Sequence, residues 1–164
     1  MTYKTLSASL RRPAFAAAFL LTLGLAGAPA SATPVCREVF GLVEIVAHEP
    51  TCGSAIALCA TATLRGSLRA ESDFVGTSSV PSIDTPATGV VLLTGDNVFH
   101  TRRGDFFTKD AIVLNTGGDG EFTEIDTITG GTGDFAGATG YLIASGHFVE
   151  GVGSGVYAGK VCKP

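Results

Sequence analysis

Two acidic residues stand two positions apart in the apolar segment 122–129, which reads FTEIDTIT. Alternate side chains of an extended strand point to the same side, so Glu124 and Asp126 would share one face with apolar neighbours. Carboxyl groups held together in apolar surroundings raise each other's pKa and can then donate or accept a proton near neutral pH. Both residues are therefore candidate catalytic acids, and so is Asp110, which alternation places on an apolar face of segment 106–114.

The alternative is that these acids point to solvent and only contribute charge, because strand register is not determined by the sequence. If they line a pocket, its polar partners are expected to be His100, Arg102 and Tyr141. We expect such a pocket to be apolar, to measure at least ~300 Å³, and to be lined by at least one of the three carboxyl groups.

The segments that must position these residues are short and rich in β-branched and aromatic residues. Twenty of the 22 glycines lie beyond residue 32, where they separate these segments, and no helical periodicity is present. This pattern predicts an all-β antiparallel sandwich or barrel. The candidate strands are 39–47, 55–64, 89–94, 98–102, 106–114, 122–129, 141–149 and 156–161. Segment 78–88 contains Pro81 and Pro86 and is expected to be a loop or an edge strand.

Several of these segments are apolar on both faces, unlike the strands of a sheet that has one side in water. Segment 106–114, for example, places Phe106 and Ile112 on one face and Phe107 and Val113 on the other. A single closed eight-stranded barrel would explain this pattern, with an interior that is packed or holds a ligand and an outer face covered by loops or a partner subunit.

The N-terminal segment 1–32 has the pattern of a secretory signal peptide. Basic residues precede the apolar run 14–26, and Ala30-Ser31-Ala32 offers a small-x-small cleavage site. A membrane anchor is the alternative, but the run is shorter than the roughly 20 residues that a spanning helix needs. A lipoprotein would instead begin at Cys36. We expect cleavage after Ala32 and a secreted or periplasmic protein in which 33–164 form one domain.

Loss of the signal peptide would change the charge of the chain. It removes three of the eleven basic residues and none of the fifteen acidic ones, so the formal net charge falls from −4 to −7. Nucleic acids and anionic membranes select for basic surfaces, so neither is an expected partner. The acidic balance favours neutral or cationic small partners.

The four cysteines all follow residue 32 and are even in number, which in an exported protein favours two disulfides. Three pairings are compatible with the sequence. We favour Cys36–Cys162, which would join the two ends of the domain, and Cys52–Cys59, which would close a local loop. The spacing matches no zinc motif, the three histidines are scattered, and Gly131–Ala136 is not followed by the helix that a dinucleotide site needs. No metal or cofactor is therefore expected.

Residues 130–140, which read GGTGDFAGATG, resemble a turn of the allene oxide cyclase and dirigent protein superfamily. The preceding segment 122–129 and the closing residues 159–162 support the resemblance, which covers about 95–164. The matching positions are turn residues that serve the fold: Gly130, Gly131, Thr132, Gly133, Phe135, Gly137 and Gly140.

This resemblance implies an eight-stranded antiparallel barrel, assembled as a homodimer or homotrimer. Its apolar cavity would bind a small hydrophobic molecule as its partner and steer the cyclisation or isomerisation of that molecule. It places no catalytic residue on this sequence. The sequence therefore leaves two functions open: a ligand-binding barrel with isomerase or cyclase activity, or a non-catalytic extracellular module with a packed interior.

Overall fold

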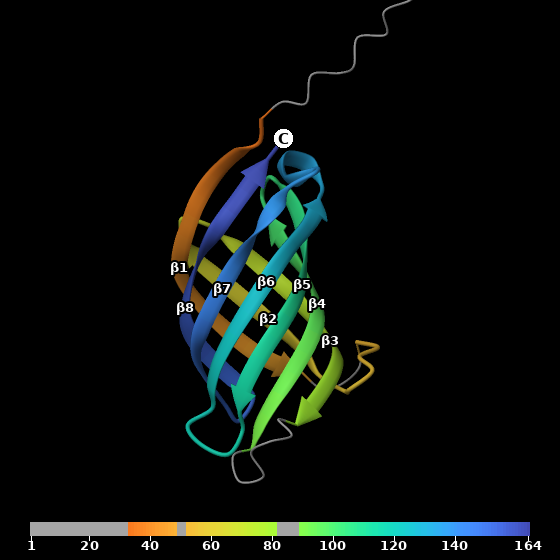
Figure 1. Cartoon of the computed structure of the whole chain (residues 1–164), viewed down its shortest axis with the longest axis vertical. Helices are drawn as coiled ribbons and strands as arrows, with labels where there is room; N and C mark the ends of the chain where they lie inside the picture. Colours follow the sequence, from red (N-terminus) through yellow and green to blue (C-terminus); the bar gives the residue numbers. More distant parts are fainter. Residues whose placement is uncertain (1–32, 49–51, 82–88) are drawn as a thin grey trace, which may run out of the picture. The chain divides into compact units, whose positions relative to one another are not determined.

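The structure is a computed structural model that describes residues 33–48, 52–81 and 89–164. The predicted signal peptide, 1–32, lies outside these residues. The described chain forms a closed antiparallel barrel in which each strand pairs with the next, as Figure 1 shows. Its strands are β1 (Val35–His48), β2 (Cys59–Gly66), β3 (Ala70–Pro81), β4 (Val90–Thr101), β5 (Gly104–Asn115), β6 (Glu121–Gly131), β7 (Thr139–Val149) and β8 (Val152–Lys163). The predicted fold class is confirmed.

The barrel closes where β1, which also pairs with β2, pairs with β8. Cys36 lies directly opposite Cys162 in this last pair of strands, and the two form a disulfide. Cys52 and Cys59 form the second disulfide, across the loop that leads into β2. Both predicted pairings are confirmed, and the first of them links the first and last strands of the barrel covalently.

The number of strands was predicted correctly, but two errors offset each other. Strand β3 was missed, because its residues AESDFVGTSSVP alternate small or polar inward positions with charged outward ones. Strand β4 was predicted as two strands, because Gly95-Asp96-Asn97 has the composition of a turn. Gly95 is instead a packing residue, since a Cβ there would collide with the ring of Phe74. The predicted loop or edge strand 78–88 begins as part of β3, and residues 82–88 lie outside the described residues.

One end of the barrel interior is filled by aromatic rings. Phe99 on β4 stacks on Phe106 on β5, with ring centroids 4.5 Å apart. Phe106 is fully buried and also contacts Phe135, with the two ring centroids 5.2 Å apart. Phe135 lies in the short 3₁₀ helix η1 (Gly133–Phe135). The ammonium group of Lys163 lies over the Phe135 ring, 4.1 Å from its centroid. This end is therefore closed.

The outer face of the barrel carries a broad apolar surface. Phe40 lies in register with Ala158, Ala158 with Ile143, and Ile143 with Ile125, so that the row crosses four strands. A second row joins Leu42 to Val156 on β1 and β8. We call this surface the outer apolar band; its large members are Phe40, Leu42, Ile125, Ile143 and Val156, each between 43% and 66% exposed. Within the described residues, no helix is long and apolar enough to cross a membrane.

Candidate functional site

Three carboxyl groups from two neighbouring strands meet inside the barrel. Asp110 on β5 lies directly opposite Asp126 on β6, and Glu124 is the next inward-facing residue along β6. One oxygen from each of the three carboxyl groups lies within 4.8 Å of the others, close enough to surround a single cation. We call Asp110, Glu124 and Asp126 the carboxyl cluster. Two of these side chains are almost completely enclosed, with Asp110 3% and Asp126 4% exposed, and Glu124 is partly buried.

Few polar groups of the barrel satisfy this cluster. The hydroxyl of Thr108 donates a hydrogen bond of 2.5 Å to Oδ1 of Asp110. Within the described residues, Oδ2 of Asp110 and Oδ1 of Asp126 have no hydrogen-bond partner. A buried oxygen without a partner costs free energy, so these atoms are available for a proton or a bound donor.

Burial and mutual repulsion keep the carboxyl cluster partly protonated near neutral pH. Burial raises the pKa of Asp110 to about 6, although hydrogen bonds from Thr108 and Asn97 oppose the shift. Burial, followed by repulsion from Asp110, raises the pKa of Glu124 to about 7. Burial and the charges of Glu124 and Asp110 raise the pKa of Asp126 well above its ordinary value. The cluster can thus hold a proton donor and a proton acceptor at the same pH.

An apolar cavity of about 110 Å³ adjoins the cluster, and Phe99 of the aromatic stack is part of its lining. Glu124 and Asp126 line it, as predicted for at least one carboxyl group. The cavity is smaller than the expected ~300 Å³, because large side chains fill much of the interior around it. Most of its wall is apolar and comes from strands all around the barrel. The apolar lining includes Val43, Leu93, Ile112, Leu114, Phe122, Leu142 and Phe148.

Two polar residues of the cavity wall were not predicted from the sequence. Ser72 on β3 is 1% exposed and Asn97 on β4 is 6% exposed, and both line the cavity. Oγ of Ser72 and Oδ1 of Asn97 lack hydrogen-bond partners within the described residues. Neither could be assigned an inward direction before their strands were known. The useful signal was that Ser72 and Asn97 both stand two residues before an aromatic residue, Phe74 and Phe99, with which they share the inner face.

The Tyr157 hydroxyl also faces the interior but is already fully used. It donates to the carbonyl of Leu68 at 2.8 Å and accepts from the amide of Leu68 at 3.1 Å. The ring fits because residue 41 is glycine, since a Cβ there would come within 2.7 Å of a ring carbon. Tyr157 therefore shapes the wall of the cavity and leaves the carboxyl cluster as its ionisable chemistry.

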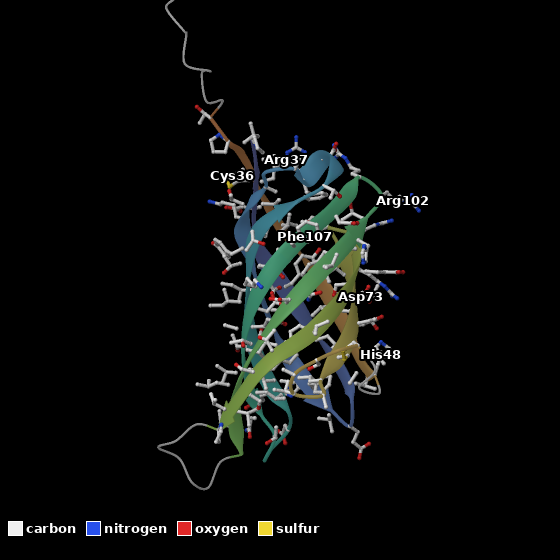
Figure 2. The ribbon with its side chains drawn as sticks, turned by 90° about the vertical axis from the view of Figure 1, so that its right-hand side faces the viewer. Cys36, Arg37, His48, Asp73, Arg102 and Phe107 are labelled. Carbon is white, nitrogen blue, oxygen red and sulfur yellow. A yellow bond between two sulfur atoms is a disulfide. The ribbon has the colours of Figure 1, made fainter. Side chains whose placement is uncertain are left out.

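The three predicted polar partners of the carboxyl groups lie outside the cavity, so this prediction was wrong. Inward-facing Phe99 forces its neighbour His100 outward, and inward-facing Leu142 does the same to Tyr141, which is 44% exposed. Arg102 lies exposed in the turn after β4 and extends away from the barrel wall (Figure 2). Outside the barrel, His100 contacts Asp73 and Asp105 instead.

The glycine-rich segment 130–140 forms the closed end of the barrel. Thr132 holds its start by exchanging hydrogen bonds with the backbone of Asp105: its hydroxyl accepts from the amide, and its own amide donates to the carbonyl. Gly133, with φ of +54°, begins η1, and Asp134 forms an ion pair with Arg103. Gly130, Gly137 and Gly140 also have positive φ, while a Cβ at Gly131 would collide with the carbonyl of Asp105. These turn residues position Phe135 against Phe106, and none of them lines the cavity.

Comparison with protein-family models and with the sequences of curated proteins finds no match. Among solved structures, a pterocarpan synthase dirigent protein is similar, with a TM-score of 0.43 and 14% sequence identity. The match covers 82% of this chain and 88% of that chain. At this level of similarity it carries no functional argument, so function is argued from the cavity and its carboxyl groups.

Proposed function

We propose that the barrel binds a small, mainly apolar molecule in its interior and steers its isomerisation or cyclisation by proton transfer. The observation that carries this proposal is the carboxyl cluster at the base of an apolar cavity. Charged groups are rarely buried without a partner unless they serve a function, and perturbed carboxyl groups in a cavity are typical of reactive sites. The resemblance of segment 130–140 to allene oxide cyclases and dirigent proteins supports the same class of function.

The chemistry requires no other reactant. A protonated carboxyl group gives its proton to one atom of the bound molecule, and an ionised neighbour removes a proton from another atom, so that a double bond or ring bond shifts with no net change in composition. Asp126, whose pKa burial and the charges of Glu124 and Asp110 raise well above its ordinary value, is the proton donor in this scheme. Glu124, with a pKa of about 7, lines the cavity and is the acceptor.

Filling the cavity tests this proposal. Ala144 lines the cavity on β7, whereas Ala111 on β5 faces outward, so Ala144→Met and Ala111→Met form a matched pair. We expect native mass spectrometry of protein purified from its own host to detect a bound small molecule in the parent protein and in the control variant Ala111→Met. We expect Ala144→Met to lose it. Equal retention by both variants would overturn the proposed location.

The small size of the cavity favours a second function, the non-catalytic module. A cavity of about 110 Å³ is below the range of roughly 300–1,000 Å³ that is typical of ligand sites. Under this alternative, Ala144→Met would raise the melting temperature by improving packing, and the protein purified from its host would carry no ligand. These two results together would replace the first proposal.

We further propose that the protein acts outside the cytoplasm. Two disulfides favour an oxidising compartment, and the pattern of residues 1–32 provides the route. N-terminal sequencing of the protein from its own host is expected to begin at Thr33. A lipidated Cys36 at the N-terminus would contradict this.

The outer apolar band supports self-association into a homodimer or homotrimer. Monomeric proteins rarely expose large contiguous apolar surfaces, and the band spans the outer faces of β1, β8, β7 and β6 in register. A second copy is the favoured occupant because an apolar row can face an identical row without unpaired charge. Ile143→Lys, at the centre of the band, is expected to convert the assembly to monomers in sedimentation velocity. Tyr141→Lys, the next outward residue along β7, is the matched control. If the parent protein itself sediments as a monomer, the proposal is contradicted.

A further inference from the structure

The polar atoms that the barrel interior leaves without partners share one property. Within the described residues they are Oγ of Ser72, Oδ1 of Asn97, Oδ2 of Asp110 and Oδ1 of Asp126. All four are oxygen atoms able to accept a hydrogen bond, and three of them belong to side chains at least 94% buried that line the cavity. The amide oxygen and the ionised carboxyl oxygens can only accept, whereas the Ser72 hydroxyl can accept or donate. The interior is therefore rich in acceptors, and a partner that brings N–H or O–H groups fits it.

The charge of the interior is equally one-sided. Among the described residues that line the cavity there is no lysine, arginine or histidine, although Glu124 and Asp126 both line it. An anionic ligand such as a fatty acid would add a further negative charge next to these groups, which is unfavourable in a poorly solvated interior. A cation would instead stabilise the ionised carboxyl groups.

The walls of the cavity decide what kind of cation fits. Calcium and magnesium ions require six or more oxygen ligands and usually keep some water. Most of the remaining lining, however, consists of apolar side chains such as Ile112, Phe122 and Leu142. Ser72 and Asn97 add one unpartnered oxygen each, which makes five with one oxygen from each carboxyl group, fewer than either ion requires. A primary ammonium group carries three N–H donors and no acceptor, and an attached hydrocarbon body would occupy the apolar space.

The volume limits that body. An apolar cavity of on the order of 150 Å³ holds a benzene molecule, so about 110 Å³ accommodates a shorter chain or a smaller ring. A body of about four carbon atoms is suitable, with any larger substituent extending away from the cluster.

From these observations we infer that the ligand is a compact apolar amine, bound as its ammonium ion with the nitrogen at the carboxyl cluster and the hydrocarbon against the apolar wall. This inference rests on the proposed function, because it assigns a chemical class to the molecule bound in the same cavity. It predicts selection by charge at the base of the cavity together with selection by size above it.

The test compares three probes with the same four-carbon body: butylammonium, 1-butanol and butyrate. Binding is followed by NMR chemical shifts of the methyl groups of Ala62 and Leu142, both of which line the cavity. At pH 8 we expect butylammonium to bind at least about tenfold more tightly than 1-butanol, which corresponds to about 1.4 kcal/mol, and butyrate not to bind. The preference should persist in 0.5 M salt, because buried charges are screened less than exposed ones.

Variants locate the nitrogen. Asp126→Asn and Asp110→Asn each remove one ionisable carboxyl group but keep the size of the side chain. Both are expected to bring the affinities for butylammonium and 1-butanol within about threefold of each other. Glu121→Gln removes an outward carboxyl group from the same strand and should leave the preference unchanged. Binding of 1-butanol by all these variants would show that the cavity remains intact.

The outcomes separate the inference from the proposed function. Equal binding of butylammonium and 1-butanol at the cavity methyl groups would overturn the ammonium assignment and leave the proposed cavity function standing. Shifts caused by calcium or magnesium ions that exclude butylammonium would overturn it in favour of a metal site. Binding of none of the three probes would contradict both the inference and the proposed function.

Discussion

Two groups of acidic side chains lie on opposite sides of the same barrel wall and have opposite surroundings. The carboxyl cluster lies inside, without a cation in the described cavity lining. On the outside, His100 lies between two acids, with Nδ1 3.1 Å from Oδ1 of Asp105 and Nε2 3.2 Å from Oδ2 of Asp73. We call Asp73, His100 and Asp105 the outer cluster. All three of its members are between 38% and 66% exposed at the side chain, and Figure 2 shows Asp73 on the outer surface.

The comparison shows that solvent exposure and neighbouring charges determine how readily an acidic residue ionises. In the outer cluster, water and an imidazole balance the two carboxylates, and the hydrogen bond to Asp105 raises the pKa of His100. In the carboxyl cluster neither is available, so the acids themselves become harder to ionise. The outer cluster can only contribute modestly to stability, whereas the carboxyl cluster can exchange protons near neutral pH or hold a bound cation.

The largest expected effect is a loss of stability with increasing pH. A carboxyl group whose pKa is higher in the folded protein stabilises the fold below its unfolded pKa, and this contribution is lost as the pH rises through the folded value. For Asp110 the pKa rises from 3.8 to about 6, and for Glu124 from 4.5 to about 7. At about 1.36 kcal/mol per pKa unit, we expect the free energy of unfolding to fall by about 2–4 kcal/mol between pH 5 and pH 8. Urea denaturation at both values measures it.

The control for this prediction is a variant in which Asp110 and Glu124 cannot ionise. Asp96 on β4 also acts on Asp110 through its charge, but it is paired with Lys109 outside the barrel. The double variant Asp110→Asn/Glu124→Gln should therefore lose most of the decrease while Asp96 remains. An unfolding free energy that rises from pH 5 to pH 8 in the parent protein would show that the interior carboxyl groups do not control stability.

A smaller effect is expected when one acid is removed from each group. At pH 8, Asp110→Asn removes a buried charge and should stabilise the protein by about 1–3 kcal/mol, in line with the cost of burying polar groups. It should also lower the pKa of Glu124, because the charge of Asp110 helps to raise it. Asp105→Asn should lower the pKa of His100 by removing its main hydrogen bond and change stability by less than about 0.5 kcal/mol.

Carboxyl-¹³C and imidazole NMR titrations measure these two pKa values, and urea denaturation measures the stabilities. Both pKa values should move downward, one through lost repulsion and the other through lost attraction. Destabilisation by Asp110→Asn at pH 8 would indicate that the ionised carboxylate is well accommodated in the interior, contrary to the comparison.

The sequence predicted the inner face of β5 and β6 because strong alternation marks it. Phe106 and Ile112 on β5, like Phe122 and Ile128 on β6, are an even number of positions apart and share a face. The direction of the acids between them follows once the strands are extended. The disulfide between the ends of the domain and the barrel class were predictable for similar reasons, since both depend on regular patterns of residue type.

Contacts between distant strands were not predictable in the same way. His100 stands close to the acids in sequence but on the outer face, and its partner Asp73 comes from β3, the strand that was missed. Register between strands depends on bulges, such as those at Gly76/Ser78 on β3 and Phe107/Thr108 on β5. Local composition does not reveal a bulge, so the polar lining from Ser72 and Asn97 became visible only with the structure.

The smallest expected effect is that of removing the imidazole from the outer cluster. His100→Ala should cost less than about 1 kcal/mol at pH 5.5, because the ion pairs are exposed and water screens them. Since the pKa of His100 is raised, its contribution is present below the ordinary value of about 6.5 and is lost as the pH rises through the folded value. We therefore expect the loss on substitution to disappear at pH 8.5. The stabilisation from His100 and that from the carboxyl cluster both decrease as the pH rises. To separate them, the substitution must also be made in the Asp110→Asn/Glu124→Gln background. An equal loss at pH 5.5 and pH 8.5 would mean that the ring stabilises β4 by packing, and that charge balance is not what distinguishes the two sides of the wall.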